Sequence, residues 1–399
     1  MPHLSRIACL DLDAFFVEVT LKERPELRGL PLAVGGTSGR GVVCSASYEA
    51  RPFGIRAGMP MWQALQKCPQ LRMLPVSHEV EAFSHRVREE LERLCPVVQQ
   101  ASVDEFYLDF TGCDRLYPRN LPLAEWICRE IDTRPGLPVT IGIGTNKLIA
   151  KVASDLGKPR GICEVFPGEE ARFLAPLALK RLPGIGPHLE ATLQSMGLQC
   201  IGEIPTLPID TWRAAFGHTG ELLYVRAQGL CDAPVIARQG ESSQKQISHE
   251  TTLSEDTGCR ATLLAWLSRL LEEAIDDLRH KHLTCGGLCV KLRYADFSTV
   301  TRSARVTRTI SDIELFPIAA GLFERLFSRR LKVRLIGIKL EALQSGGVTP
   351  PLWQVLESER RLALPGVIEQ VRDRFGTRAV LRARSIVPAR RGSPPRRPS

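Results

Sequence analysis

A strand-like segment near the N-terminus carries two carboxylates, and few folds accommodate that combination. Residues 6–13 alternate as a strand buried in a core does, which places Asp11 and Asp13 on one face. A carboxylate on a buried strand costs free energy unless a cation or hydrogen-bond donors accompany it. The segment therefore indicates a core strand that ends beside a polar or metal-binding site.

A second acidic cluster lies on another strand-like segment, residues 103–110. Asp104 and Glu105 are adjacent, so a regular strand would direct them to opposite faces, and a shared site needs a turn or bulge there. Asp109 follows on the same segment. Carboxylate oxygens are the donors that hold Mg²⁺ near a phosphoryl group, so one interpretation is a two-metal site. The other interpretation is that these are turn acids at strand ends.

The pattern of predicted elements divides the chain into three regions. Strands and helices mix over residues 1–165, which favours an α+β or α/β domain. Short helices broken by Gly and Pro follow over residues 166–235, without a strand pattern. Beyond a polar stretch at residues 239–244, the order strand, helix, two strands, helix, strand predicts a small, independent α/β sandwich.

The formal net charge of +9 is concentrated at the C-terminus. Residues 378–399 hold seven Arg and no acidic residue, so the rest of the chain carries only +2. Nucleic-acid binding must therefore rest on local patches rather than on bulk charge. Apolar runs are too short for a membrane span and acids occur early, so we expect a cytoplasmic protein without a signal peptide.

Three polar side chains, Ser45, Tyr48 and Arg51, recur at three-residue spacing. On a helix they would share a face and could grip a polyphosphate. An exposed polar helix face is the alternative. Lys158, in Lys-Pro-Arg-Gly, adds a cation behind a predicted helix end. The segment Gly142–Lys147 lacks the G-x-x-x-x-G-K-[ST] pattern of a phosphate-binding loop, so we assign it no such role.

Six separated motifs, in order along the chain, resemble the Y-family DNA polymerases, the low-fidelity translesion enzymes, and most closely their bacterial DinB type. The resemblance covers residues 6 to about 342. The motifs are Asp11-Leu-Asp-Ala-Phe-Phe16, Tyr48-Glu-Ala-Arg-Pro-Phe-Gly54, Ser102-Val-Asp-Glu-Phe-Tyr-Leu-Asp109, Gly142-Ile-Gly-Thr-Asn-Lys-Leu-Ile-Ala-Lys151, Lys158-Pro-Arg-Gly161 and Leu182-Pro-Gly-Ile-Gly186.

The resemblance implies an α+β multidomain fold, a right-hand polymerase with palm, small fingers, helical thumb and a β-α-β-β-α-β little finger. The implied bounds are 1–14 and 76–165 for the palm, 15–75 for the fingers, 166–238 for the thumb, 239–342 for the little finger and 343–399 for a C-terminal tail. The tail is expected to be basic and disordered at its end. Bacterial members often carry a clamp-binding peptide there, and Pro350–Leu356 matches that peptide poorly.

The resemblance also implies the metal ligands and the chemistry. Asp11, Asp104 and Glu105 match carboxylates that bind two Mg²⁺ ions, with the carbonyl of Leu12 as a further ligand. Glu105 matches the catalytic carboxylate beside the primer 3′-hydroxyl, and Asp13 is given a structural role. One ion is expected to lower the pKa of that hydroxyl, and the other to neutralise the triphosphate and pyrophosphate.

Phe16 matches an aromatic steric gate, a ring under the sugar that leaves no room for a 2′-hydroxyl. Its neighbour Phe15 fits a core position better. The residues that match triphosphate-binding positions are Ser45, Tyr48, Arg51 and Lys158. One departure concerns Phe106, because the family usually has a small residue there and a ring beside the two acids could crowd the site.

Two regions match DNA-binding elements of the family. Leu182–Gly186 and the helix after it resemble a helix-hairpin-helix, in which Gly184 and Gly186 let backbone N–H groups approach a phosphate; a plain turn is the alternative. Basic residues on the predicted strand pair of the sandwich could lie along a DNA backbone. They are Lys291, Arg293, Arg302 and Arg305.

The implied function is template-directed, low-fidelity DNA synthesis that adds dNTPs to a primer 3′-end in translesion synthesis and damage tolerance, without proofreading. The implied partners are primer-template DNA and dNTPs, with the replication sliding clamp as a candidate and a monomeric state. One alternative is a catalytically impaired Y-family relative that acts as a scaffold in a mutagenesis complex. Another is an unrelated two-metal nuclease or nucleotide cyclase, which would leave the gate and the hairpin unexplained.

Overall fold

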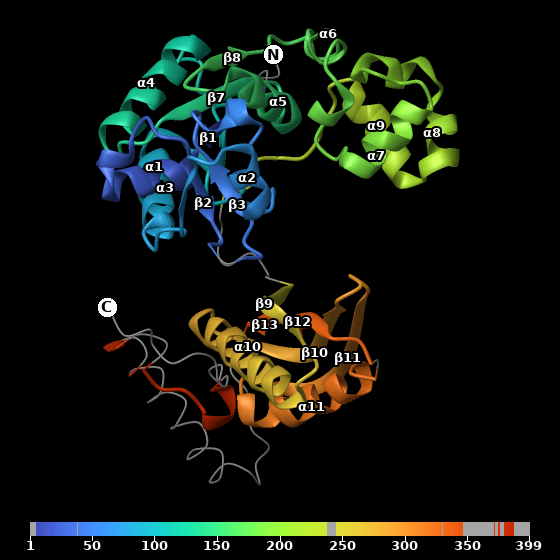
Figure 1. Cartoon of the computed structure of the whole chain (residues 1–399). Coiled ribbons are helices and arrows are strands. Elements are labelled where there is room, and N and C mark those ends of the chain that lie inside the picture. The colour runs from blue at the N-terminus through green and yellow to red at the C-terminus, as the bar shows by residue number, and fades with distance from the viewer. Residues whose placement is uncertain are drawn as a thin grey trace. The chain divides into compact units, whose positions relative to one another are not determined.

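The computed structural model shows two compact units, Met1–Gly240 and Glu241–Ser399 (Figure 1). The residues whose placement the structure describes are 5–37, 39–237, 245–328, 330–345, 371, 374–375 and 379–386. Within these residues, no helix combines the length and apolar character needed to cross a membrane.

A five-stranded mixed sheet lies at the centre of the first unit, with β1 as its middle strand. β1 pairs antiparallel with β6 and β7, and β7 pairs parallel with β8. In spatial order the strands are β5 (Val97–Gln100), β6 (Glu105–Asp109), β1 (Ile7–Leu12), β7 (Val139–Gly144) and β8 (Ile162–Glu164). The predicted strands at residues 6–13 and 103–110 are therefore neighbours.

The two faces of this sheet differ because side chains alternate along each strand. Leu10 and Phe106 belong to the main apolar core, which includes residues of α1 (Phe15–Glu23), α3 (Val80–Leu94) and α4 (Asn120–Thr133). On the opposite face, α5 (Lys147–Gly157) packs against β7 and β1. The face under α5 carries the acidic residues.

Gly142 allows α5 to lie close to the sheet. A Cβ at this position would lie 2.1 Å from the carbonyl oxygen of Ala150 and from the amide nitrogen of Ser154, both on α5. Real Cβ atoms do not approach backbone atoms so closely, so any larger residue would push the helix away. Gly142 pairs with Cys9 on β1, one alternation from Asp11, so this contact sets the height of α5 above the acidic residues.

A smaller three-stranded sheet follows α1 along the chain. Its order is β3 (Val43–Ala46), β2 (Leu32–Gly35) and β4 (Arg72–Leu74), with β2 antiparallel to β3 and parallel to β4. The elements around it are the short 3₁₀ helices η1 (Pro25–Leu27) and η2 (Arg51–Phe53) and the helix α2 (Met61–Lys67).

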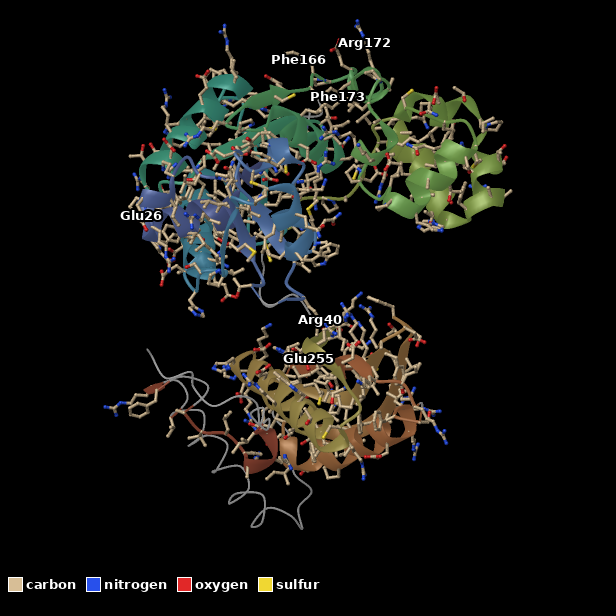
Figure 2. All side chains as sticks on the ribbon, in the orientation of Figure 1. Glu26, Arg40, Phe166, Arg172, Phe173 and Glu255 are labelled. Atoms are coloured by element: carbon tan, nitrogen blue, oxygen red, sulfur yellow. The ribbon has the colours of Figure 1, made fainter. Side chains whose placement is uncertain are left out.

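The region after β8 is helical, as the sequence predicts. It contains α6 (Glu170–Leu174), η3 (Leu179–Arg181), α7 (Pro187–Ser195), η4 (Ile201–Thr206), α8 (Ile209–Phe216) and α9 (His218–Ala227). Trp212 is buried in its core and donates its indole N–H to the carbonyl of Ile204 at 2.9 Å. Phe166 and Arg172, at the start of this region, are exposed, as Figure 2 shows.

Side-chain hydrogen bonds connect the helical region to the five-stranded sheet. Asn146, at the N-cap of α5, donates to the carbonyl of Gly229 at 2.7 Å, and Thr145 donates to Glu170 at 2.7 Å. Gln99 on β5 accepts from the ammonium of Lys147 at 2.9 Å and from the backbone N–H of Ile236 at 3.1 Å. The chain that leaves α9 is therefore fixed on the sheet.

The second unit has the predicted β-α-β-β-α-β order. Its elements are β9 (Gln246–Thr257), α10 (Arg260–His280), β10 (Leu283–Tyr294), β11 (Thr299–Thr309), α11 (Asp312–Leu326) and β12 (Val333–Glu341). The strands form an antiparallel sheet in the order β11-β10-β12-β9. Both helices pack on one face of it, side by side (Figure 1).

Two short elements follow β12. β13 (Gln344–Ser345) pairs with β10, and the 3₁₀ helix η6 (Ala383–Ser385) contacts α10. The Pro350–Leu356 segment and most of the expected tail lie outside the described residues, as does the polar stretch at 239–244.

Candidate active site

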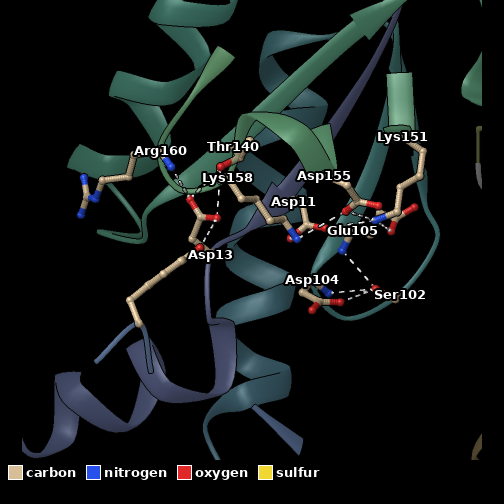
Figure 3. Close-up of polar contacts among 11 residues, drawn as sticks. Asp11, Asp13, Ser102, Asp104, Glu105, Thr140, Lys151, Asp155, Lys158 and Arg160 are labelled. Carbon is tan, nitrogen blue, oxygen red and sulfur yellow. Dashed lines mark hydrogen bonds and ion pairs between the residues drawn. The ribbon is translucent and has the colours of Figure 1, made fainter. Parts of the chain in front are cut away.

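Asp11 and Glu105 lie opposite each other on β1 and β6. Asp11 is buried, with 5% of its surface exposed, and Glu105 is half-buried. The ammonium of Lys151, on α5, lies 3.2 Å from Oδ2 of Asp11 and 2.5 Å from Oε2 of Glu105. The two carboxylates therefore share one cation, which Figure 3 shows between them.

A second lysine completes the ion-pair cluster. Lys158, directly after α5, places its ammonium 2.6 Å from Oδ1 of Asp11. Asp155 lies 3.4 Å from Lys151 and 3.8 Å from Lys158. Burial alone would lower the pKa of Lys151, but its hydrogen bond to Glu105 and the charges of Asp11 and Asp155 outweigh it, so the pKa is raised. Lys151 is therefore charged at neutral pH.

The Asp104 carboxylate makes a different contact. Its Oδ1 accepts a hydrogen bond from the Ser102 hydroxyl, whose oxygen also accepts the N–H of Glu105 at 3.1 Å. The carbonyl of Asp104 accepts the N–H of Leu12 at 2.9 Å, so its backbone stays beside the end of β1. Across the described ranges, no group of three or more Asp, Glu, His or Cys is gathered as metal ligands would be. The structure thus brings Asp11 and Glu105 together and directs Asp104 to Ser102.

The donor set nevertheless suits a hard divalent cation. Asp11, Glu105 and Asp104 supply carboxylate oxygens only, and carboxylate oxygens are the preferred ligands of Mg²⁺ and Mn²⁺. Two ammonium groups already lie on these oxygens, which shows that the carboxylates attract positive charge here. Because backbone hydrogen bonds hold Asp104 next to β1, a change of its side-chain rotamer can redirect its carboxylate without moving the sheet.

Asp13 is a structural residue in this fold. It is 2% exposed and accepts hydrogen bonds from the hydroxyl of Thr140 at 2.9 Å, the backbone N–H of Arg160 at 2.8 Å and the phenol of Tyr48 at 3.1 Å. These donors satisfy the buried charge without a metal. Burial, followed by the charge of Asp13, raises the pKa of Tyr48 to about 12, so the phenol stays protonated.

Asp109 and Phe106 both lie away from the ion-pair cluster. Asp109 accepts the N–H of Thr111 at 2.8 Å at the far end of β6. Phe106 is fully buried in the apolar core and pairs with Leu10, on the face opposite Glu105. The ring therefore packs behind the acidic residues and does not crowd them.

Phe15 and Phe16 differ in exposure as the sequence predicts. Phe15 is 1% exposed and belongs to the core under the sheet. Phe16, the next residue of α1, is half-buried, and its ring centroid lies 5.8 Å from that of Phe15 in an edge-to-face arrangement. Phe16 therefore rests on a rigid core while part of its ring remains accessible.

The helix expected over residues 45–51 does not form. Ser45 lies on β3, paired with Val34, and Arg51 begins the short 3₁₀ helix η2. The intervening residues form a turn, in which Ala50 donates its N–H to the carbonyl of Ser47 at 3.0 Å. Tyr48 and Arg51 still meet, because the guanidinium stacks 3.8 Å from the centroid of the phenol ring. Three-residue spacing does not distinguish a helix from a strand that enters a turn.

The Leu182–Gly186 motif connects η3 to α7. Gly184 has a φ of 105°, which only glycine adopts readily. The carbonyl of the preceding residue, Pro183, accepts a hydrogen bond from the guanidinium of Arg226 on α9 at 3.1 Å. Gly186, in an extended conformation, is the N-cap of α7. Because glycine has no side chain, no capping group covers the N-terminal amides of that helix. This helix–turn–helix geometry agrees with the predicted hairpin.

The expected basic residues of the second unit do not all share one face. Lys291 and Arg293 alternate with core residues on β10, and Gly287, on the same face, pairs with Arg305 on β11. The side chains of Lys291, Arg293 and Arg305 therefore lie on the face of the sheet that the helices do not cover. Arg302 pairs with the buried Val290, which places it on the helix-covered face at the edge.

Salt bridges on the helix-free face offset part of its positive charge. The ammonium of Lys291 lies 2.6 Å from Glu250 on β9, and that of Lys339 lies 2.5 Å from Glu341 on β12. Arg293 donates to the hydroxyl of Thr299 at 2.9 Å, and among the described residues neither Arg293 nor Arg305 forms an ion pair with an acid. These two arginines are thus the main cations of this face available to an anion.

Three residues in or beside the ion-pair cluster were not identified from the sequence: Lys151, Asp155 and Ser102. Lys151 and Ser102 both occur in the quoted motifs, but their partners lie far away in the chain or depend on a turn. One signal was available for Lys151: it is followed four residues later by Asp155 on an amphipathic helix, which favours a polar face. The spacing of residues along α5 does not indicate which part of the fold the polar face with Lys151 and Asp155 contacts.

The family comparisons agree with this arrangement. Residues 10–155 match the impB/mucB/samB family, residues 167–198 match the IMS family HHH motif, and residues 244–350 match the impB/mucB/samB family C-terminal domain. The HHH match contains the Leu182–Gly186 turn, and the C-terminal match contains the four-stranded sheet of the second unit.

Curated relatives cover nearly the whole chain. A DNA polymerase IV from Desulfatibacillum aliphaticivorans is 35% identical over 93% of this chain and 94% of the relative. The DNA polymerase IV from Caulobacter vibrioides is 34% identical over 95% and 94%. One from Dehalococcoides mccartyi strain CBDB1 is 38% identical over 84% and 86%.

Solved structures give the same family. A Y-family DNA polymerase chimera, Dbh-Dpo4(243-245)-Dbh, superposes with a TM-score of 0.76 at 28% identity, covering 86% of this chain and 100% of the other. DinB from Sulfolobus solfataricus gives a TM-score of 0.57 at 29% identity, covering 84% and 98%. The fold is thus that of a Y-family polymerase, with palm, small fingers, helix-hairpin-helix thumb and little finger. The chain belongs to the impB/mucB/samB family, and among its members it resembles the DNA polymerases IV.

Proposed function

We propose that this chain is a DNA-directed DNA polymerase of the translesion type, which adds dNTPs to a primer 3′-end under the direction of a template. The observation that carries the proposal is the pairing of Asp11 with Glu105 at the end of the central strand, with Asp104 beside them. The scaffold alternative has no support, because the three acidic residues are all present and the relatives are DNA polymerases IV.

Asp11, Asp104 and Glu105, with the carbonyl of Leu12, are the proposed ligands of two divalent ions, for which Mg²⁺ is our choice. When bound, the ions would supply charge neutralisation at the triphosphate and lower the pKa of the primer 3′-hydroxyl. Glu105 lies at the start of β6 and is half-buried, so it remains accessible to a primer end. Its proposed role is to orient that hydroxyl.

Lys158 is proposed to exchange partners when substrate binds. Its ammonium now lies 2.6 Å from Asp11, and a cation bound at Asp11 would repel it. A four-carbon side chain on an exposed turn can reach a new anion by rotation alone. The triphosphate is the anion that the proposal supplies, together with Arg51, Tyr48 and Ser45 as its other contacts.

Phe16 is the proposed sugar gate. Its ring is supported by the buried Phe15 and cannot retreat without disturbing the core of α1. A sugar that rests on the exposed part of this ring would have no space for a 2′-hydroxyl. Selection for deoxyribose would then depend on side-chain volume rather than on a hydrogen bond.

Primer-template DNA is proposed to contact two elements without base readout. Gly184 and Gly186 expose backbone amides of the thumb hairpin to a phosphate, and Arg293 and Arg305 present cations on the open face of the little finger. Lys291 contributes less in this proposal because Glu250 already neutralises it. Such contacts suit an enzyme that must accept any sequence.

Three further features belong to the proposal. The domain bounds are those given by the sequence: palm 1–14 and 76–165, fingers 15–75, thumb 166–238 and little finger 239–342. The protein is proposed to act as a monomer in the cytoplasm. The tail 343–399 is the candidate contact for the sliding clamp, which a pull-down with and without that tail would test.

Primer extension tests the proposed function directly. The wild-type chain, with Mg²⁺, four dNTPs and a primed template, is expected to extend the primer. Glu105→Ala is expected to lose at least about 100-fold in rate, the usual cost of removing one preorganised electrostatic group. Asp109→Ala is the matched control, because it is an acid of the same strand outside the cluster. Equal extension by wild type and Glu105→Ala would refute the site.

A further inference from the structure

The second unit contains a docked C-terminal segment that the polymerase function does not explain. Residues 379–386 lie against α10 and α11, with η6 as their ordered centre (Figure 1, red). The sequence of the docked part is Arg382-Ala-Arg-Ser385. Because β13 pairs with β10 as well, the chain after β12 is held on this unit at two separate places.

Asp312, at the first turn of α11, is the centre of the contact. It is only 4% exposed. Arg382 forms an ion pair with its carboxylate and donates to Oδ1 at 2.8 Å, and Arg384 donates to Oδ2 at 3.1 Å. Among the described residues, the other cation within ion-pair distance of Asp312 is Arg279, with Nη2 at 3.9 Å. A carboxylate buried to this extent needs close donors, and the segment supplies most of them.

Ser385 is buried beside a second acid. It is 2% exposed, and its hydroxyl donates to Oε1 of Glu272 on α10. The same hydroxyl lies 3.0 Å from that of Ser268, one turn earlier on α10. Glu272 and Ser268 are both buried as well. A larger side chain at this buried position would have to displace Ser268 or Glu272, and a negatively charged one would be repelled by the Glu272 carboxylate.

Arg384 is recognised through three kinds of contact. Besides Asp312, its Nε donates to the hydroxyl of Ser268 at 3.0 Å, and its guanidinium lies 4.2 Å from the centroid of the Phe316 ring on α11. A lysine could not reproduce the planar donor fork and the stacking together. The contacts therefore select the residue type at three of the four positions.

We propose that the site on α10 and α11 that contacts residues 382–385 is a peptide-recognition site for an Arg-x-Arg-Ser sequence, and that the chain's own residues 382–385 fill it. We call it the Asp312 notch, formed by Asp312, Phe316, Ser268 and Glu272. It fixes the C-terminal extension to the little finger independently of DNA and nucleotide. The acidic notch and the basic segment are complementary in charge, in hydrogen-bond geometry and in size.

A peptide-binding experiment tests the notch. The probe is a fluorescent peptide of residues 379–386, and the proteins are the full chain and a chain that ends at residue 378. The shortened chain is expected to bind the peptide at least tenfold more tightly than the full chain, whose notch is filled. Asp312→Asn in the shortened chain should weaken binding at least tenfold, whereas Glu324→Gln, elsewhere on α11, should not. Equal binding by the full and shortened chains, or by the Asp312→Asn variant, would overturn the proposal.

A proteolysis experiment uses the full chain and does not depend on the truncation. Trypsin should cut slowly after Arg382 and Arg384 in the wild type, because both guanidiniums are engaged. Asp312→Asn and Ser385→Glu are expected to raise that rate at least fivefold, while Glu324→Gln leaves it unchanged. The wild-type rate should not vary with protein concentration, since the segment docks in its own chain. The same rate in wild type and Asp312→Asn, or protection that appears only at high concentration, would contradict docking within the chain.

Discussion

Asp11 and Glu105 stand opposite each other on antiparallel strands, and the ammonium of Lys151 lies within 3.2 Å of an oxygen of each. Two like charges on a half-buried surface are stable only when a cation lies between them. In this structure the cation is a lysine of α5. In the proposed catalytic state, divalent ions take over part of that role.

Replacing Lys151 is expected to make the fold more dependent on divalent metal. In Lys151→Met, Asp11 and Glu105 lose their shared cation, so the melting temperature without metal should fall by several degrees, about the shift that 1–2 kcal/mol produces. Mg²⁺ should restore more stability to this variant than it adds to the wild type, since binding to the folded state stabilises it.

Differential scanning fluorimetry with and without Mg²⁺ measures both quantities. Lys147→Met is the matched control, because Lys147 lies one turn earlier on α5 and contacts Gln99 instead of the acids. Equal metal-induced shifts in wild type and Lys151→Met would show that the two carboxylates do not bind the ion.

Shortening Phe16 is expected to admit ribonucleotides. Phe16→Val removes the accessible part of the ring, so the ratio of kcat/KM for dNTP over rNTP should fall by at least about tenfold, equivalent to about 1.4 kcal/mol of lost discrimination. Single-nucleotide insertion kinetics provide the measurement.

Phe15→Leu serves as the control for this variant. Phe15 is buried, so the substitution should cost about 1–2 kcal/mol of stability and leave sugar discrimination unchanged. If Phe16→Val selected deoxyribose as strictly as the wild type, the gate would have to be another residue.

The contact between Tyr48 and Asp13 predicts a specific loss of stability at high pH. The phenol pKa is about 10 in an unfolded chain and is raised to about 12 in the folded protein, by burial first and by the charge of Asp13 second. The folded state therefore holds this proton more tightly. The stabilisation that the protonated Tyr48 phenol gives the folded state is complete below pH 10 and is lost as the pH rises towards 12.

Urea denaturation of wild type and Tyr48→Phe across that range isolates the effect, because other groups titrate equally in both chains. The stability difference between them should be constant below pH 10 and should shift against the wild type above it. A difference that does not change with pH would mean that the phenol is not protected in the folded state.

Local periodicity was sufficient for much of the fold. The alternation of residues 6–13 identified β1, and the order of elements after residue 244 identified the β-α-β-β-α-β unit correctly. The family resemblance, not periodicity, gave Asp13 a structural role, and it did not give the hydrogen-bond donors of Asp13. Those donors, Thr140, Tyr48 and Arg160, come from three distant segments, and no single spacing connects them.

Other features depend on contacts that local sequence does not encode. The helix expected for Ser45 to Arg51 does not form because Ser45 pairs with Val34 on the neighbouring strand β2, a contact between segments distant in the sequence. The pairing of Lys151 with Asp11 follows from the height of α5 above the sheet, which Gly142 sets. Arg302 is a different case, because it lies three residues before Arg305 on one strand and alternation alone already places the two side chains on opposite faces. The comparisons confirm the resemblance to Y-family polymerases, and that resemblance, rather than periodicity, is the source of the proposed site residues.

The positions of the divalent ions decide whether Asp11, Asp104 and Glu105 form the metal site. Crystals of the chain with primer-template DNA, a non-hydrolysable dNTP and Mn²⁺ would reveal each ion by its anomalous scattering. Two ions are expected within about 2.2 Å of oxygens of Asp11, Asp104 and Glu105, with Asp104 released from Ser102 and Lys158 moved to the triphosphate. Ions bound elsewhere, or an Asp104 that stays on Ser102 while nucleotide is bound, would contradict the proposed metal site.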